Sequence, residues 1–402
     1  MQTSITATHA SETLTISLAR LFERASYYGL RALIVLYMIS ETFTMERSEA
    51  LYIYGIFTSS IVLSPLLGSI LGDLVFGSKR GVIIGGCLQA LGAFSLCIPT
   101  TTGLYVGIVL TVLGGGFYTP NLIAFFGKQY LTKTKLLDSG FTILYLAVSL
   151  GVFLGILSIG FIGEMYGYSY GFALAGVLAL LSTLLIVITK EAKLPEQSVF
   201  ENSIWNRIAK IALAFLFIGI FWALYSVSGY AMSDIQLQVK AQYNDSLPDG
   251  LWSSVSSIGI YPISIIAILL WMRSYQNRFL KIAIGFFAAA LSFGLLTLIP
   301  ESIDSTYLVV FFGALILLSI AEVCIAPIIH SMLTKHTHPK YLAMVIALSF
   351  IPMRLLVLST EFLGDTIYDH VKLGLYIGMI AMPIMGIGAV LFYFVFRKVE
   401  KA

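Results

Sequence analysis

Charged residues are scarce in this sequence. Only 11% of its 402 residues are Asp, Glu, Lys or Arg, whereas 58% are hydrophobic. A soluble globular domain carries about 25% charged residues and could not place so much apolar surface in its interior. The scarcity of charge therefore excludes soluble enzymes and nucleic-acid-binding proteins, and it indicates a chain that lies in a lipid bilayer.

Side chains that carry catalysis or bind metals are also scarce. The chain has three cysteines and five histidines, and neither set shows the spacing of a metal site or a catalytic constellation. The glycines at 114–116 lie inside an apolar run and not in a phosphate-binding loop. We therefore expect no catalytic residue, no metal, no cofactor, no ATP-driven step and no enzyme activity. The polar N-terminus, with His9 and Glu12, lacks the basic region of a cleaved signal peptide, so we expect none.

Long apolar runs dominate what is present. They are continuous and do not alternate, which argues against a membrane β-barrel. A helix needs roughly 20 apolar residues to cross a bilayer. Twelve runs of that kind are bounded by polar residues, glycine or proline, at 16–40, 50–75, 81–100, 103–127, 138–162, 169–189, 207–231, 250–272, 279–300, 305–333, 341–369 and 374–396. The sequence therefore predicts an all-α polytopic membrane protein with twelve transmembrane helices.

The widest polar break near the middle of the chain divides these runs into six and six. It predicts an N-terminal six-helix bundle over 1–189, a cytoplasmic linker over 190–206 and a C-terminal six-helix bundle over 207–402. Two related halves of this kind are typical of secondary transporters.

The distribution of lysine and arginine between the loops predicts the orientation. Most of these cations fall on one side of the predicted spans, and only Arg47, Lys240 and Lys372 fall on the other. Because cytoplasmic loops carry the excess of cations, both termini are predicted to be cytoplasmic. The short loops favour a multi-pass protein of the cell membrane, specifically a bacterial inner membrane.

Seven of the charged residues inside the predicted spans stand out: Arg20, Glu23, Arg24, Arg31, Glu322, Arg354 and Glu361. A charge at the bilayer centre costs several kcal/mol, so each is expected to face a cavity or a partner. At about 100° per residue, the first span places Arg20, Arg24, Tyr27 and Arg31 within about 60° of one another. Glu23 is spaced to pair with an arginine. The alternative is that these arginines extend to the membrane interface.

The charges in the later spans leave alternatives open. Glu322 is either a protonatable group, half of a buried pair, or a permanently neutral acid hydrogen-bonded between helices. Arg354 and Glu361 are seven residues apart, so they share a helix face and form either a structural or a functional pair.

Several motifs resemble one transporter family. Residues 23–31, ERASYYGLR, resemble the first-helix signature ExxERFxYYGxR of the proton-dependent oligopeptide transporters, a branch of the major facilitator superfamily. Residues 68–80, GSILGDLVFGSKR, resemble the superfamily's loop motif between helices two and three. Further matches follow in the expected order at 114–121, at 139–151, at Phe221 with Trp222, and at Glu322 with Pro327. The resemblance implies the superfamily's fold of two six-helix bundles.

The resemblance also implies roles for individual residues. For proton coupling it implies Glu23, Arg24 and Glu322. The expected substrate-binding residues are Arg20, Arg24, Tyr27, Tyr28, Arg31, Thr119, Ser149, Trp222, Tyr225 and Glu322. The expected gating residues are Asp73, Lys79, Arg80, Arg354 and Glu361.

The departures from the family pattern make the expected cavity more basic. Arg20 stands where the signature has its first glutamate, Thr119 where the fourth helix has lysine, and Ser149 where the fifth helix has asparagine. Tyr225 and Ser226 stand at the positions after Trp222 where the family pattern has acidic residues.

Two substrate classes therefore remain for a secondary transporter that works by alternating access and needs only a monomer. The first is di- and tripeptides or peptide-like solutes, carried with protons. The alternative is import or export of an anionic, carboxylate-bearing metabolite such as a carboxylate siderophore, with weakened or absent proton coupling. A third hypothesis is a transporter-like receptor, which would bind solute without moving it.

Overall fold

The computed structural model describes residues 8–60, 62–192, 203–243, 257–273, 275, 277–299, 305–362 and 371–399. Within these ranges every regular element is helical. The chain divides into two compact units. Unit 1 comprises Met1–Ser198 and Thr337–Leu348, and unit 2 comprises Val199–His336 and Ser349–Ala402. Residues 193–202, most of the predicted linker, lie outside the described residues.

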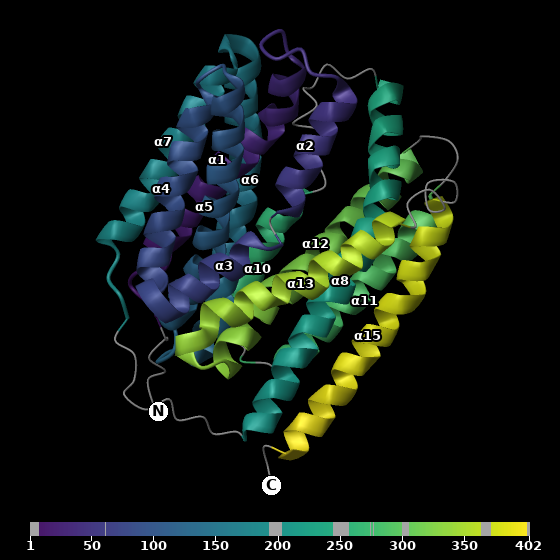
Figure 1. Cartoon of the computed structure of the whole chain (residues 1–402). Coiled ribbons are helices and arrows are strands. Elements are labelled where there is room, and N and C mark those ends of the chain that lie inside the picture. Colours follow the sequence, from purple (N-terminus) through teal and green to yellow (C-terminus); the bar gives the residue numbers. More distant parts are fainter. Residues whose placement is uncertain are drawn as a thin grey trace. The chain divides into compact units, whose positions relative to one another are not determined.

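Unit 1 is built from long helices joined by short turns. Its elements are α1 (Thr13–Ile39), α2 (Arg47–Ser59), α3 (Ser64–Leu71), η1 (Gly72–Phe76), α4 (Ser78–Leu96), α5 (Thr101–Lys128), η2 (Thr134–Leu136), α6 (Leu137–Tyr166), α7 (Tyr168–Ile188), η4 (Pro339–Tyr341) and the start of α13 (Leu342–Phe362). Helix α1 lies against α6 and α7, and α4 lies against α5 and α7 (Figure 1).

The turns between these helices follow from local sequence. Gly77 separates η1 from α4 with φ +85°, and Gly167 separates α6 from α7 with φ +112°. Glycine adopts such positive φ values without the steric cost that a Cβ imposes. Thr100 caps α5, because its side chain accepts a hydrogen bond from the Gly103 backbone N–H at 3.0 Å.

Glycines bring α6 close to the charged helix α1. A Cβ at Gly155 would overlap backbone atoms of Ala25, and a Cβ at Gly151 would lie 2.9 Å from the Cβ of Arg24. Small residues four apart allow membrane helices to approach at backbone distance. The close approach fixes the position of α1, which carries most of the intramembrane charge of this unit.

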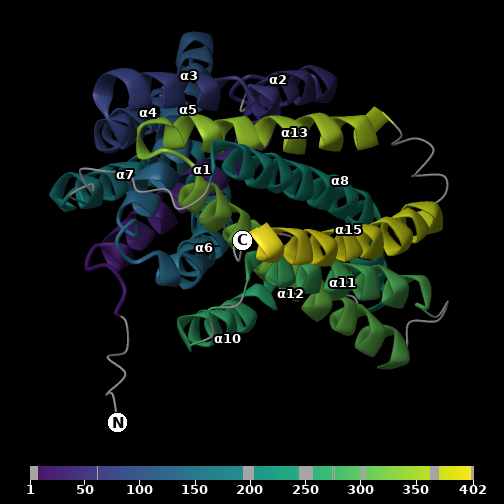
Figure 2. The same ribbon diagram turned by 90° about the horizontal axis from the view of Figure 1, so that it is seen from below.

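Unit 2 consists of α8 (Ile204–Tyr243), α10 (Ile260–Arg273), α11 (Arg278–Thr297), α12 (Ser305–His336), the remainder of α13 and α15 (Val371–Val399). Helix α11 lies against α12 and α15, and α8 lies against the same two helices (Figure 2). Helix α8 extends twelve residues beyond the apolar run 207–231, because the polar segment 232–243 contains neither glycine nor proline to end it.

Nine helical segments among the described residues are long and apolar enough to cross a membrane. The other three predicted runs coincide with α1, α4 and the 14-residue helix α10. Helix α1 is long enough to cross a membrane but carries four charged residues, at 20, 23, 24 and 31. In the described part of the chain, each predicted run thus overlaps at least one helix, and the run 50–75 overlaps α2, α3 and η1. The predicted all-α, multi-pass membrane architecture is confirmed.

Candidate functional site

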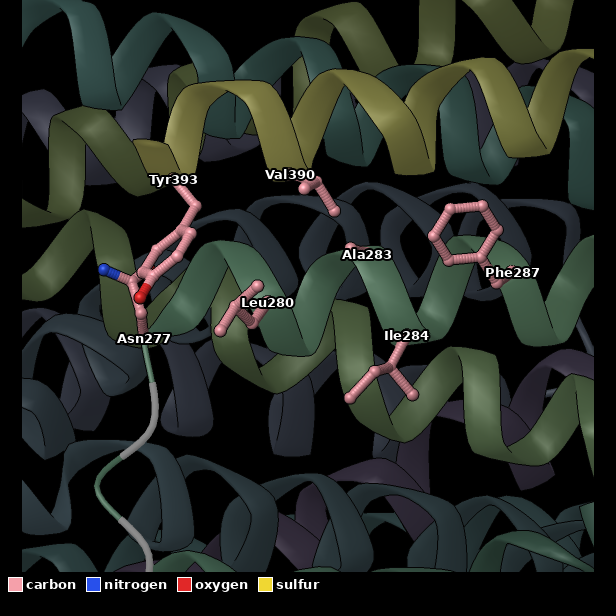
Figure 3. A pocket seen from close by; sticks show the side chains of 7 residues that line it. All are labelled: Asn277, Leu280, Ala283, Ile284, Phe287, Val390 and Tyr393. Atoms are coloured by element: carbon pink, nitrogen blue, oxygen red, sulfur yellow. The ribbon is translucent and has the colours of Figure 1, made fainter. Parts of the chain in front are cut away.

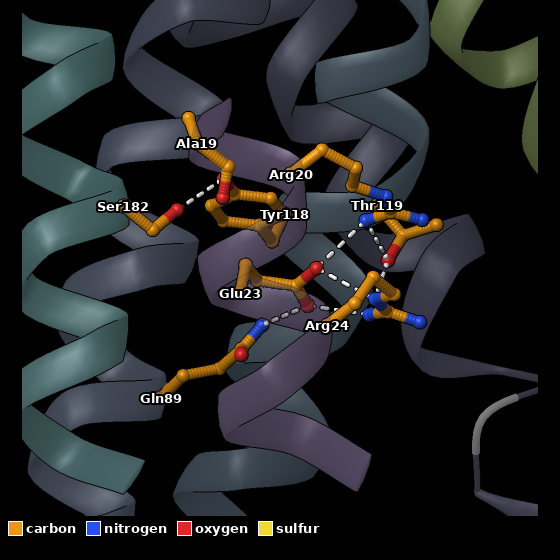
Figure 4. Close-up of polar contacts among 8 residues, drawn as sticks. All are labelled: Ala19, Arg20, Glu23, Arg24, Gln89, Tyr118, Thr119 and Ser182. Carbon is orange, nitrogen blue, oxygen red and sulfur yellow. Dashed lines mark hydrogen bonds and ion pairs between the residues drawn. The ribbon is translucent and has the colours of Figure 1, made fainter. Parts of the chain in front are cut away.

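A buried charged cluster surrounds Glu23 in unit 1 (Figure 4). The Glu23 carboxylate is fully buried, and each of its oxygens accepts two hydrogen bonds. Oε2 accepts from Arg20 Nη1 at 2.9 Å and from Arg24 Nε at 2.6 Å. Oε1 accepts from Arg24 Nη2 and from Gln89 Nε2, the latter at 3.2 Å. The spacing along α1 predicted a Glu23–arginine pair, and the structure confirms it with two arginines.

Thr119 of α5 contacts both Arg20 and Arg24, the two arginines that donate to Glu23. Its hydroxyl oxygen lies 3.2 Å from Arg20 Nη1 and 3.3 Å from Arg24 Nη2. One hydroxyl oxygen has two lone pairs, so it can accept both bonds. We call the five residues Arg20, Glu23, Arg24, Gln89 and Thr119 the α1 cluster. It ties α1 to α4 and α5.

The α1 cluster carries one more positive charge than negative charge. Arg20 is 5% exposed, and the Arg24 side chain is 11% exposed. All four groups that contact the Glu23 oxygens are N–H donors. Such a set of donors fits the ionised carboxylate, because a carboxylic acid would need an acceptor for its own proton.

The neighbouring residue Tyr118 fixes this part of α5 against two other helices. Its hydroxyl lies 2.5 Å from Ser182 Oγ on α7 and 3.4 Å from the Ala19 carbonyl oxygen on α1. Both bonds are buried. These two bonds position α5 along α1 so that the Thr119 hydroxyl lies within hydrogen-bond distance of Arg20 and Arg24.

Aromatic rings line the arginines on α1. The Arg24 guanidinium lies 5.0 Å from the ring centre of Tyr27 and 5.6 Å from that of Tyr28. The Arg31 guanidinium lies 5.9 Å from the ring of Tyr28 and 5.4 Å from the ring of Tyr54 on α2, and its Nε donates to the Tyr54 hydroxyl at 2.5 Å. Contacts of this kind orient a guanidinium and leave it cationic.

These residues together give α1 the chemistry of an anion site. Arg20, Arg24 and Arg31 carry three guanidinium groups, whereas Glu23 is the only carboxylate that contacts any of them among the described residues. A guanidinium binds a carboxylate through two parallel hydrogen bonds, which gives both affinity and orientation.

Ser149 lies on α6 and is half-buried. Its hydroxyl donates to the Tyr145 carbonyl oxygen of its own helix at 3.2 Å. The structure therefore places this predicted residue on a helix that packs against α1, but no hydrogen bond joins its hydroxyl to the α1 cluster within the described part of the chain.

Three predicted residues come together in unit 2. Glu322 on α12 is 6% exposed and is hydrogen-bonded to Tyr225 on α8. The Tyr225 ring lies 5.1 Å from the ring of Trp222 and 5.8 Å from that of Phe221, centre to centre. Glu322 is thus partnered by a phenol at one of the positions where the family pattern has acids.

Three of the predicted gating residues, Asp73, Lys79 and Arg80, occupy the ends of helices in unit 1. Asp73 Oδ2 accepts a hydrogen bond from the Met344 backbone N–H at 2.9 Å, and its Oδ1 lies 3.9 Å from Lys128 Nζ. Lys79 donates to the Val187 carbonyl oxygen at the end of α7, at 3.0 Å, and Arg80 is exposed. Asp73 therefore connects η1 to the first turn of α13.

The remaining gating pair is only partly described. Arg354 is half-buried on α13, and the Glu361 side chain lies outside the described residues. The pairing predicted from their spacing stays a prediction.

Sequence reasoning missed Gln89 and Tyr54. Gln89 is the one amide in the apolar run 81–100, and a polar side chain inside a span is a signal that could have indicated it. Tyr54 is one of 22 tyrosines and carries no such signal. Its contact with Arg31 depends on how α2 packs against α1.

Comparisons with known proteins agree with this architecture. The family model of the Major Facilitator Superfamily matches residues 16–357. The chain is 32% identical over 191 residues to the uncharacterized transporter YclF of Bacillus subtilis, covering 46% of this chain and 39% of that protein. It is 30% identical over 199 residues to the peptide transporter YePEPT of Yersinia enterocolitica, covering 47% of this chain and 39% of that one. The matched segment thus spans well under half the length of these relatives.

Solved structures show the same fold. A bacterial homologue of the human drug peptide transporters PepT1 and PepT2 aligns with a TM-score of 0.59 at 18% identity, covering 98% of this chain and 100% of that one. A peptide transporter called POT, in complex with sulfate, aligns with a TM-score of 0.58 at 23% identity, covering 96% and 94%. The predicted resemblance to oligopeptide transporters is confirmed, and the relatives are transporters and not enzymes. With a family model that covers most of its length, the chain belongs to the Major Facilitator Superfamily.

Proposed function

We propose that this chain is a secondary active transporter that works by alternating access and carries di- and tripeptides or peptide-like solutes together with protons. The observation that carries the proposal is the α1 cluster, in which arginines are held in a membrane helix by buried partners. Peptide transporters among the relatives support the substrate class.

In this proposal the arginines of α1 bind the substrate carboxylate. Arg31 is half-buried, and its Nε–Tyr54 bond and ring contacts orient its guanidinium. Tyr27 and Tyr28 line the same helix face, and Thr119 holds Arg20 and Arg24 in place. Ser149 and Trp222 complete the proposed substrate-binding residues.

The proposed proton site is Glu322 with its partner Tyr225. A phenol donates a hydrogen bond to a carboxylate and accepts one from a carboxylic acid, so this pair stays bonded in both protonation states. Glu23 has only N–H donors around it, and protonation would break at least one of those bonds. We therefore assign Glu23 and Arg24 to the coupling network as fixed charges, and Glu322 as the group that gains and loses the proton.

A second substrate class is favoured by the charge of the α1 cluster. Its excess cation and the nearby Arg31 fit a ligand with more than one carboxylate better than they fit a zwitterion. An anionic, carboxylate-bearing metabolite, with weakened or absent proton coupling, is the corresponding function.

The remaining assignments belong to the same proposal. Asp73, Lys79 and Arg80 act in gating, with Asp73 tying η1 to α13, and Arg354 with Glu361 acts as a second gating pair. The protein is a monomer in a bacterial inner membrane with both termini in the cytoplasm.

The test is uptake of labelled dialanine into proteoliposomes with an inward proton gradient. We expect excess unlabelled dialanine to block uptake and an excess of a tricarboxylate to leave it unchanged. Arg31→Gln is expected to raise the KM for dialanine about tenfold or more, the effect of losing one hydrogen bond to a charged group. Arg47→Gln, at an exposed position of the same unit, is the matched control. Competition by the tricarboxylate would favour the second class, and binding without uptake would indicate a receptor.

A further inference from the structure

A groove of about 450 Å³ runs between α11 and α15 in unit 2 (Figure 3). It is lined by Asn277, Leu280, Ala283, Ile284, Phe287, Val390 and Tyr393. None of these residues belongs to the α1 cluster or to the Glu322–Tyr225 pair. The groove is therefore separate from the groups to which the proposed transport function assigns substrate and proton.

The groove is apolar along most of its length. Its α11 wall consists of residues three or four positions apart, which places Leu280, Ile284 and Phe287 on one helix face. The Ile284 side chain is 50% exposed and that of Phe287 is 38% exposed, so this face opens outward from the unit. Phe287 closes the far end, where an added Cβ on Gly386 of α15 would lie 3.0 Å from its ring.

The other end of the groove is polar and basic. Arg397 Nη1 donates to the Tyr393 hydroxyl at 3.2 Å, and the guanidinium lies 5.8 Å from the centre of the Tyr393 ring. Asn277 caps the first turn of α11 by accepting from the Phe279 N–H at 2.9 Å. The groove thus ends beside the positive end of a helix and one arginine.

More positive charge lies behind this end. The Phe396 ring, next to Arg397, stacks on Phe279 at 5.5 Å between centres. The ammonium of Lys210 lies 5.0 Å from the centre of the Phe396 ring. A cation from α8 thus lies behind the Phe279–Phe396 ring pair, in addition to Arg397 of α15.

Both helices that form the groove are among the segments able to cross a membrane, and Arg397 is the last residue of its segment. The apolar length of the groove thus lies at the depth of the lipid tails, and its basic end lies at the depth of the headgroups. A molecule with an apolar chain and an anionic head matches this order along the helices, and the bilayer supplies it.

We propose that the groove between α11 and α15 binds a phospholipid with an anionic headgroup. One acyl chain lies along Leu280, Ile284 and Phe287, and the phosphate lies beside Arg397, Tyr393 and Asn277. The lipid fills space between two spanning helices. It contributes an apolar contact that the two helices do not make with each other there.

The test is native mass spectrometry of the full chain in micelles that contain phosphatidylglycerol and phosphatidylcholine with the same acyl chains. The parent is expected to retain phosphatidylglycerol in preference to phosphatidylcholine. Leu280→Trp, which fills the groove, is expected to lose both adducts. Arg397→Gln is expected to reduce the preference about fivefold and to keep the phosphatidylcholine adduct, since one basic side chain contributes about 1 kcal/mol beside an anionic headgroup.

Two further variants make the result decisive. Leu291→Trp changes a side chain that is 62% exposed on the same helix but does not line the groove, and it should bind lipid like the parent. Ile284→Trp replaces Leu280→Trp if the latter does not fold. Equal lipid retention by the parent and the groove-filling variant would overturn the proposal, as would an absence of headgroup preference in the parent. A parent dimer that Leu280→Trp abolishes would overturn it too, because a second copy would then occupy the groove.

Discussion

Glu23 is held by two guanidinium groups and an amide from a second helix, in a place that water does not reach. A buried ion pair contributes little net stability compared with a well-packed apolar pair, because both charges lose their hydration. Removing one partner alone is costly, because the other charge stays buried without compensation. The α1 cluster is therefore expected to be sensitive to loss of its single carboxylate.

Glu23→Gln is expected to lower the free energy of unfolding by about 3–5 kcal/mol, because Arg20 and Arg24 then face each other without an anion. Thermal unfolding of the purified protein in detergent measures the loss. Glu164→Gln, at an exposed position on α6, is the matched control and should unfold at the parent's temperature. Equal unfolding temperatures for both variants would contradict the account of this cluster.

At this scale the sequence predicts contacts within a helix better than contacts between helices. The spacing of Arg20 and Glu23 predicts their pairing, because residues three apart meet on a helix face. Arg24 also pairs with Glu23 although the two are adjacent in sequence, and helix spacing does not predict this second contact. Gln89 reaches Glu23 across 66 positions of sequence, and this contact depends on how α4 packs against α1. The Tyr225–Glu322 pair is likewise an outcome of packing between α8 and α12.

Helix packing around α1 depends on where glycine stands on α6. Gly155 faces the backbone of Ala25, whereas an added Cβ at Gly160 meets no atom within 4 Å. These two glycines of one helix thus differ in environment but not in residue type. They allow packing to be separated from helix propensity.

Gly155→Ala is expected to destabilise the protein by about 1–3 kcal/mol, the usual cost of overpacking a close contact. Gly160→Ala is expected to stabilise it by about 0.5–1 kcal/mol, because alanine loses less backbone entropy in a helix than glycine does. Unfolding temperatures measured side by side should therefore move in opposite directions. A shift of the same sign and size for both would mean that α1 and α6 are not in close contact at Gly155.

The segment before α1 is bound to the loop between α5 and α6. Lys133 Nζ donates to the backbone oxygens of Thr8 at 2.9 Å and His9 at 3.2 Å, and His9 Nδ1 lies 2.9 Å from the Tyr130 hydroxyl. Burial, and secondly the Lys133 ammonium, lowers the pKa of His9 below its ordinary value. Neutral His9 therefore fits the folded protein better than protonated His9.

Acidification should weaken this attachment. Because the pKa is lower in the folded state, the unfolded chain takes up the proton first, and the contribution of His9 to stability declines as the pH falls below about 6.5. The unfolding temperature of the parent is expected to fall more between pH 7.5 and pH 5.5 than that of His9→Gln. Parallel changes in the two proteins would show that His9 does not carry this dependence. Since His9 is half-buried, the expected difference is small.

The sequence predicts which segments form helices better than it predicts where those helices end. Each apolar run overlaps at least one helix among the described residues, because spanning the bilayer demands apolar length, which is a local property of sequence. The extension of α8 to Tyr243 was not predicted, because a polar segment can continue a helix when no breaker intervenes. Hydropathy reports the apolar part of a helix and not its full length.

For the whole molecule, the sequence predicts the superfamily but not the assembly of the units. Residues 337–348 belong to unit 1 although they lie between two parts of unit 2 in the chain, and the Asp73–Met344 contact is part of unit 1. Motif spacing indicated Asp73, but not the backbone N–H that it would bind. The substrate class likewise depends on contacts between residues that are far apart in the sequence, because these contacts decide which charged side chains lie together.

The proposed coupling of transport to protons through Glu322 can be tested directly. The measurement compares gradient-driven accumulation of labelled dialanine with exchange of labelled for unlabelled dialanine at equal pH, in proteoliposomes of the parent, Glu322→Gln and Glu164→Gln. We expect Glu322→Gln to keep exchange and lose accumulation, because the substrate still binds while no proton can be taken up. Glu164→Gln should keep both. Accumulation by Glu322→Gln at the parent's level, or no accumulation by a folded parent, would contradict the claim.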